Sequence, residues 1–208
     1  MARPEKGQKC LRGGRVSLPD VDYFVTACIE ERQPLLRAER SRRVLHDSLT
    51  YCEASGLIVW HCYTTMPDHI HALFKLRDLK TLSQFIESFK KWTSRRIDGL
   101  SCRSPLQRTT PRPRARRCSV DQGSGSTTAL HRALESPPTS VSKVWQDGFF
   151  DHGIRSEQDF DETVLYIFLN PVEDGLATEP WSWPGFRAKP EIDEWLRRWQ
   201  AEEKRIDQ

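Results

Sequence analysis

The stretch MPDHIHALFKL, residues 66–76, places two histidines in a run that otherwise has the apolar character of a buried strand. In an extended strand, successive side chains point to opposite faces, so residues two apart share a face. His69 and His71 are therefore expected to project together, with Ile70 turned the other way into the core. A pair of imidazoles this close could share a metal ion, cap a polar pocket or line the solvent-facing side of a sheet.

The segments around this stretch predict the first half of an α+β domain. Apolar and β-branched runs favour strands, and apolar residues at helical spacing favour amphipathic helices. The second and third strands are close enough along the chain to form an antiparallel hairpin. The predicted elements are, in order, a strand at 22–30, a helix at 35–55 closed by Gly56, strands at 57–65 and 70–76, and a helix at 82–97.

A change of composition follows at residues 101–142, where Ser, Thr, Pro, Arg and Gly dominate. This segment has too few apolar residues to offset its ordering entropy, which predicts an insertion or disordered loop within one domain. Its basic run RPRARR, residues 112–117, is interpreted as a solvated tether that adds at most nonspecific affinity for phosphates.

Order is predicted to resume at VWQDGFFDHGIR, residues 144–155, as a short strand or packed loop. Ser156 then caps a helix that is expected to end before Pro171. The element order predicts an antiparallel sheet of about four strands with helices on one face, in a ferredoxin-like or RRM-like arrangement. The predicted organisation is a flexible arm at 1–20, one domain at 21–186, and a C-terminal helix and tail at 187–208.

Composition limits the class of protein. The 32 lysines and arginines nearly balance 29 acidic residues, so a net charge of +3 does not by itself indicate a nucleic-acid partner. The six cysteines form no CxxC pair and no secretory leader precedes them, which predicts a cytoplasmic protein. The longest apolar runs fall well short of the roughly 20 residues that cross a bilayer, so no membrane span is expected.

Tyr166 and Asn170 are four residues apart on the helix predicted after Ser156, so they share one face of it. If this helix packs across the sheet beside the histidine pair, the four side chains meet. Two imidazole nitrogens and an amide oxygen form an open shell suited to a divalent cation. A tyrosine beside that cation could attack a phosphodiester and keep the energy of the broken bond in a phosphotyrosine, which suits DNA strand transfer better than degradation.

Three stretches resemble known families. MPDHIHALF resembles the His-hydrophobe-His strand of the HUH endonuclease superfamily. VWQDGFFDHGIRSEQDFDETVLYIFLNPVEDGL, residues 144–176, resembles the C-terminal half of the REP-associated tyrosine transposases, which are relatives of the single-tyrosine insertion-sequence transposases. WSWPGF, residues 181–186, resembles an aromatic segment of the same family in altered order. The positions that match are Pro67, Asp68, His69, His71, Trp145, Gln146, Asp151, His152, Tyr166, Asn170, Pro171 and Gly175.

The resemblance implies a function and a set of site residues. His69, His71 and Asn170 would hold Mg²⁺ or Mn²⁺, and Tyr166 would be the nucleophile that takes the 5′-phosphate. The substrate would be single-stranded DNA near a hairpin, and a monomer is favoured over a dimer. The insertion at 101–142 replaces the short connection usual in the family. Residues with a predicted DNA-binding role are Lys90, Lys91, Arg95, Arg96, His152 and Arg155.

Three alternatives stay open. Tyr63, on the partner strand of the hairpin, is a rival nucleophile that lacks the one-turn link to Asn170. The chain could instead be a non-catalytic module that binds single-stranded nucleic acid on the same fold. It could also be a metal-dependent hydrolase that uses water, with Tyr166 only packing.

Overall fold

The computed structural model describes residues 17–101 and 143–206 of the 208-residue chain. The predicted insertion and the basic run RPRARR therefore lie outside the described residues, as does most of the predicted N-terminal arm. Short 3₁₀ turns occur at Glu30–Arg32, Leu35–Arg37 and Pro180–Ser182. The main elements are β1 Asp22–Cys28, α1 Glu39–Ala54, β2 Ile58–Thr65, β3 His69–Leu76, α2 Leu82–Ser101, β4 Phe150–Gly153, α3 Glu157–Glu173, β5 Phe186–Ala188 and α4 Pro190–Ile206.

The strands form one antiparallel sheet in the order β4-β1-β3-β2-β5. This confirms the predicted α+β class and the β2–β3 hairpin, and it adds one short strand to the predicted four. The long strands β1, β3 and β2 occupy the centre. In their register, Thr26 of β1 and Thr64 of β2 both lie opposite His71 of β3. Because directly opposed residues project to the same side of a sheet, these three side chains share one face.

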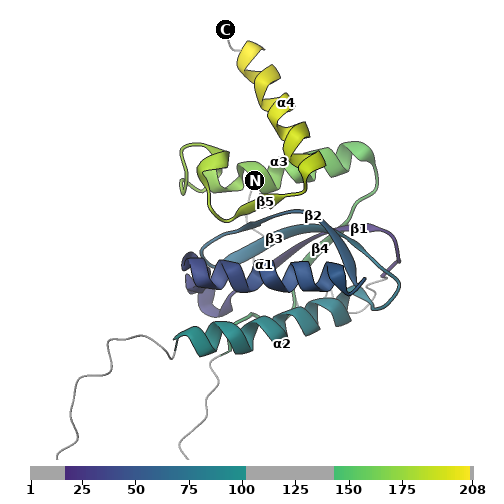
Figure 1. Cartoon of the computed structure of the whole chain (residues 1–208), viewed down its shortest axis with the longest axis vertical. Coiled ribbons are helices and arrows are strands. Elements are labelled where there is room, and N and C mark those ends of the chain that lie inside the picture. The colour runs from purple at the N-terminus through teal and green to yellow at the C-terminus, as the bar shows by residue number, and fades with distance from the viewer. Residues whose placement is uncertain (1–16, 102–142, 207–208) are drawn as a thin grey trace, which may run out of the picture.

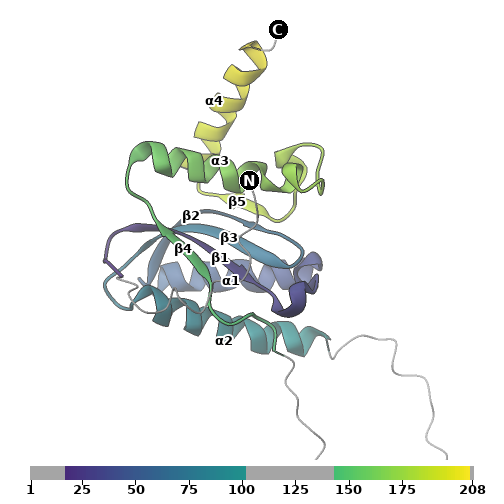
Figure 2. The same cartoon turned by 180° about the vertical axis from the view of Figure 1, so that it is seen from behind.

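Helices cover both faces of the sheet, not the single face that the sequence predicted. The helices α1 and α2 lie together against one face, and α3 crosses the other (Figures 1 and 2). The reason is that the central strands carry apolar residues on both sides. Phe24, Cys62 and Leu73 form a second core with the apolar side of α3, which is separate from the core under α1 and α2.

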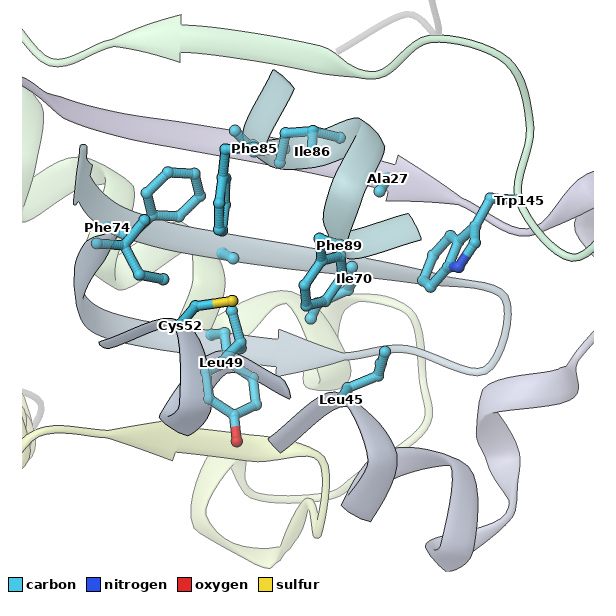
Figure 3. Packing of buried hydrophobic residues seen from close by; sticks show 14 of the residues in the cluster. Ala27, Leu45, Leu49, Cys52, Ile70, Phe74, Phe85, Ile86, Phe89 and Trp145 are labelled. Atoms are coloured by element: carbon cyan, nitrogen blue, oxygen red, sulfur yellow. The ribbon is translucent and has the colours of Figure 1, made fainter. Parts of the chain in front are cut away.

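The larger core lies between the sheet and the α1–α2 layer (Figure 3). Phe74 of the sheet meets Phe85 of α2 with ring centroids 5.1 Å apart, and Trp145 closes one end of the core beside Phe89. The smaller core lies on the α3 side, where α4 inserts Leu196 before it projects from the body (Figure 1). The α3 side of the sheet is therefore only partly filled by apolar packing, which leaves room there for polar side chains.

Helix α3 continues past Pro171, whereas the sequence predicted that it ends before this residue. A proline within the last turn removes only one backbone donor, and the Pro171 ring is buried. The helix ends instead at Glu173, with Asp174 as its C-cap, followed by Gly175 with φ +69°, a backbone conformation that glycine adopts without a steric penalty. None of the helices in the described ranges is long and apolar enough to cross a membrane.

In the loop that leads into β5, the backbone of Gly185 lies close to the backbone of Thr65 at the end of β2. Its carbonyl accepts a hydrogen bond from the Thr65 amide at 2.9 Å, and the Trp183 indole N–H donates to the Thr65 carbonyl at 3.1 Å. A Cβ at position 185 would lie 2.3 Å from that same carbonyl oxygen.

Gly185→Ala is therefore expected to lower the free energy of unfolding by about 1–3 kcal/mol, because the loop must move away from β2. Denaturant unfolding measures the effect. Gly153→Ala is the matched control, since a Cβ there meets the Tyr23 ring at an ordinary 3.6 Å. Equal stability of the two variants would contradict the expected close approach.

Candidate active site

The two histidines of β3 project from the same face, as their spacing predicts. Their Nε2 atoms are 3.0 Å apart and their ring centroids 4.6 Å apart. Both side chains are buried. They lie on the face covered by α3, beneath its middle turns.

Each imidazole is oriented by a polar neighbour on its other ring nitrogen. His69 Nδ1 lies 2.6 Å from an Asp68 carboxylate oxygen, and His71 Nδ1 lies 2.8 Å from the Thr26 hydroxyl. A proton on each Nδ1 satisfies these contacts and leaves both Nε2 lone pairs directed at each other. In this tautomer a cation between the two nitrogens offsets the repulsion of the lone pairs; if the Thr26 hydroxyl donates to His71 Nδ1 instead, the His71 Nε2–H donates to His69 Nε2. Acceptors behind Nδ1 are the usual partners of histidines that bind metals through Nε2.

Burial keeps both imidazoles in the neutral form. Desolvation lowers the pKa of His69, although the Asp68 carboxylate acts in the opposite direction. The pKa of His71 lies well below its usual value, first because of burial and second because of the neighbouring His69. A neutral imidazole is the form that ligates metal ions.

Helix α3 adds a tyrosine and an asparagine to the same place. The Tyr166 ring lies 5.2 Å from the His71 ring and packs perpendicular to Phe24 at 5.7 Å. Tyr166 is 43% exposed, so part of this residue is open to solvent. Asn170, one turn further on, is only 7% exposed, and its Oδ1 atom has no hydrogen-bond partner among the described residues. Tyr166 therefore lies beside the imidazole pair, and Asn170 lies one turn further along the same face of α3, within reach of the Tyr166 hydroxyl.

The environment of Tyr166 favours the protonated phenol. Partial burial raises its pKa, and the nearby carboxylates of Glu173 and Asp174 raise it further. A side-chain hydrogen bond with Asn170 acts in the opposite direction. Attack by this oxygen therefore needs a group that offsets negative charge.

The donor atoms fit a divalent cation. Two ligands at about 2.1 Å from a cation and at right angles to each other lie about 3 Å apart, which is the separation of the two Nε2 atoms. Asn170 Oδ1 is a buried oxygen in need of a partner. In the described part of the chain, no group of three or more His, Cys, Asp or Glu is placed so that all could hold one metal ion, so a cation here would depend on the amide oxygen and on waters or substrate.

An outer layer of contacts, not anticipated from the sequence, holds Asp68 in position. Arg32 Nε lies 2.8 Å from the second Asp68 oxygen, and its Nη1 donates to Cys28 Sγ at 3.0 Å. Glu31 and Arg32 both have positive φ angles, 53° and 56°, which are uncommon for residues other than glycine. This strained turn directs Arg32 toward the histidine strand. No sequence signal marks such a turn, whereas Asp68 is visible in the motif.

The six residues with a predicted DNA-binding role divide between the two sides of the sheet. Lys90, Lys91, Arg95 and Arg96 lie on α2, across the sheet from the imidazoles. Lys90 donates to the backbone carbonyls of Gln146 and Gly148, and the Arg96 guanidinium lies 3.5 Å from the Trp92 ring centroid. These α2 residues are therefore not part of the imidazole site.

His152 and Arg155 lie on the imidazole side, at the approach to α3. His152 Nε2 is 2.9 Å from both carboxylate oxygens of Asp159. Asp159 also accepts from the Arg155 amide, and its own amide donates to the Ser156 hydroxyl that caps the helix. These contacts fix the start of α3 and hold the His152 side chain beside it.

Tyr63, the rival nucleophile, points to the opposite face of the sheet. It is 2% exposed, and its hydroxyl lies 2.7 Å from His46 Nδ1 under α1. Burial raises its pKa well above the usual range. Tyr63 is therefore separated by the sheet from the imidazoles.

Comparisons with known proteins agree with the fold and with the resemblance seen in the sequence. A family model described as IS200-like transposase matches residues 17–101. A REP-associated tyrosine transposase from Escherichia coli (strain K12) is 36% identical over 44 residues, which are 21% of this chain and 27% of that protein. The structure of a REP-associated tyrosine transposase bound to a REP hairpin shares the fold with a TM-score of 0.56 and 18% identity, over 83% of this chain and 79% of the other. These matches confirm the resemblance seen in the sequence: the chain is similar to the IS200-like transposases and to the REP-associated tyrosine transposases, and its match to the Escherichia coli protein spans about a quarter of that protein's length.

Proposed function

We propose that this chain is a metal-dependent endonuclease and strand transferase for single-stranded DNA, with Tyr166 as its nucleophile. The observation that carries the proposal is the meeting of Tyr166 with the paired imidazoles, whose nearer ring lies 5.2 Å away. The relationship to tyrosine transposases supports it. Because one relative was solved with a REP hairpin, we propose that the substrate strand lies beside a hairpin-forming repeat.

In this proposal His69, His71 and Asn170 hold Mg²⁺ or Mn²⁺. The bound ion would supply positive charge that stabilises the phosphoryl oxygens during attack. Asp68 and Thr26 keep both Nε2 atoms aimed at the ion, and Asn170 contributes its otherwise unpartnered oxygen.

Tyr166 carries out the covalent step. Its oxygen attacks the phosphorus of a phosphodiester, the bond between phosphorus and the 3′ oxygen breaks, and the 5′-phosphate stays on the tyrosine. The phenol proton passes to solvent, to which this residue is partly open, and the released 3′ oxygen takes up a proton. Attack by a 3′-hydroxyl on the phosphotyrosine reverses the step and joins strands without a nucleotide cofactor.

An end-labelling assay tests this proposal. A single-stranded oligonucleotide is incubated with the protein and Mn²⁺, with the label on its 5′ end in one reaction and on its 3′ end in another. We expect only the 3′-end label to remain on the protein under denaturing conditions, with the 5′ fragment released and carrying a free 3′-hydroxyl. A free 5′-phosphate fragment without any adduct would favour water as the nucleophile, and binding without cleavage would favour a non-catalytic module.

The Arg32 contact leads to a prediction about metal affinity. Arg32→Ala removes the cation that holds Asp68 against His69, so the imidazole loses its fixed orientation. We expect Mn²⁺ to bind DNA-free protein about tenfold more weakly, at the lower end of what outer contacts of a metal site contribute. Electron paramagnetic resonance of free Mn²⁺ measures this.

Arg77→Ala is the matched control, because Arg77 is an exposed arginine that pairs with Asp20 at 2.6 Å, on the far end of β3. If the Arg32→Ala protein bound Mn²⁺ as tightly as the Arg77→Ala control, Arg32 would have no role in metal binding.

A further inference from the structure

A second polar cavity lies on the other side of the sheet from the imidazoles. It has a volume of about 350 Å³ and opens between α1, the end of β2 and the loop that enters β5. The charged and polar residues that line it include Glu39, Arg42, Arg43, His46, Thr65 and Arg187.

The charge in this cavity is strongly positive. Three guanidinium groups line it, from Arg42, Arg43 and Arg187, against the one carboxylate of Glu39. Among the ion pairs formed by the described residues, none includes these three arginines. Within ranges 17–101 and 143–206, Arg42 and Arg187 donate to backbone carbonyls, those of Arg37, Pro184 and Phe186, and to no side chain. Because a guanidinium has five N–H donors, most of them remain available to an anion.

Thr65, one of the residues that line this cavity, carries a buried hydroxyl with no partner among the described residues. Thr65 is 1% exposed, and its Oγ1 has no hydrogen-bond partner in the described structure. Its backbone is fixed on both sides, by the Gly185 carbonyl and the Trp183 indole. A buried hydroxyl without a partner destabilises the fold, so an unsatisfied one that lines a cavity points to a ligand that satisfies it.

The position of the cavity separates it from the reacting centre. Thr64 lies opposite His71 and shares its face, so Tyr63 and Thr65, one residue to either side, point the other way. His46 confirms this placement, since it reaches Tyr63 from α1. An anion in the cavity is therefore separated by the sheet from Tyr166.

We propose that this cavity binds a non-reacting phosphate of the nucleic-acid strand, through Arg42, Arg43 and Arg187 with the Thr65 hydroxyl. Several guanidinium donors converging on one opening suit the oxygens of a phosphodiester, and backbone phosphates are the usual partners of such groups in nucleic-acid complexes. That the phosphate belongs to DNA rests on the proposed function. The contact anchors the strand away from the site of cleavage, so it contributes to binding and not to the chemical step.

The test measures binding without cleavage. A fluorescent hairpin oligonucleotide with single-stranded flanks is titrated with full-length protein in EDTA, at several salt concentrations. The variant Arg42→Gln/Arg43→Gln is expected to bind more weakly and to reduce the slope of log K against log salt by about 1 to 2, close to one per lost phosphate contact. Arg40→Gln, an exposed arginine on the same helix that does not line the cavity, is the control for the change of charge. If the slope of log K against log salt for Arg42→Gln/Arg43→Gln were as steep as that for Arg40→Gln, the proposal would be overturned.

Thr65→Val separates a ligand contact from a packing defect. Removing an unpartnered buried hydroxyl while keeping the side-chain shape is expected to raise the melting temperature of the DNA-free protein. Because the same hydroxyl contacts the phosphate, oligonucleotide binding is expected to weaken several-fold. A variant that is more stable and binds as tightly as wild type would contradict the role of Thr65.

Two further readouts keep this proposal distinct from the proposed function. Cleavage by the double arginine variant should show a raised KM with an unchanged kcat. The wild-type protein could form no covalent adduct while the double variant still showed a smaller slope of log K against log salt. In that case phosphate binding in the cavity would be supported and the proposed enzyme activity would be wrong. If pyrophosphate binds in a manner that depends on Arg42 and Arg43 while oligonucleotide binding does not, the cavity serves a small phosphate compound and the strand contact is refuted.

Discussion

Tyr166→Phe is expected to abolish the covalent protein–DNA adduct, with a fall in cleavage rate on the order of 10⁴ or more, as for loss of other enzyme nucleophiles. The substitution removes one oxygen. The ring keeps its contacts with His71 and Phe24, so folding and oligonucleotide binding should stay near wild type. Denaturing gels with a labelled oligonucleotide measure the adduct, and a thermal melt checks the fold.

Tyr51→Phe is the matched control, since Tyr51 is 64% exposed on α1 and remote from the imidazoles. It should form the adduct at the wild-type rate. Persistence of the adduct in the Tyr166→Phe protein would show that another residue attacks the phosphate.

The second large effect is expected from His71→Gln. This change keeps a buried polar side chain of similar length and replaces the imidazole, whose ring nitrogen faces His69 at 3.0 Å, by an amide. If the pair holds the cation, Mn²⁺ affinity of DNA-free protein should be largely lost. Cleavage should fall by a factor on the order of 10² to 10³, which corresponds to several kcal/mol of lost charge stabilisation.

His61→Gln controls for loss of a partly buried histidine in the same sheet. His61 pairs with Asp22 at 2.7 Å and has no contact with the imidazole site. Its variant should keep both Mn²⁺ affinity and cleavage. A His71→Gln protein with wild-type Mn²⁺ affinity would contradict the assignment of the metal to this pair, whatever the effect on activity.

Local periodicity was enough to predict most of the site. Residues two apart on a strand and four apart on a helix share a face by geometry alone, which holds for His69 with His71 and for Tyr166 with Asn170. That the strand and the helix then meet depends on packing between distant segments, and the sequence supported this only through family resemblance. The hydrophobic pattern of α3 was visible, but not which face of the sheet it covers.

The features that the sequence did not predict all depend on contacts between distant segments or on unusual backbone geometry. Thr26 supports His71 because of the register between β1 and β3, and residues far apart in sequence do not reveal their register. Arg32 reaches Asp68 only through a turn with positive φ angles at non-glycine residues, which has no sequence signature. Strand β5 has three residues, too few for a periodic signal. Pro171 stays helical because it falls in the last turn, where one lost donor matters little.

Mapping the adduct by mass spectrometry tests the central claim most directly. The protein is reacted with a single-stranded oligonucleotide and Mn²⁺, the DNA is trimmed with nuclease, and the protein is digested with trypsin. Cleavage after Arg155 and Arg187 yields a peptide in which Tyr166 is the only tyrosine. The account predicts a nucleotide linked through its 5′-phosphate to Tyr166 in this peptide. A nucleotide on Tyr63 or another residue, or cleaved DNA with no modified tyrosine, would contradict it.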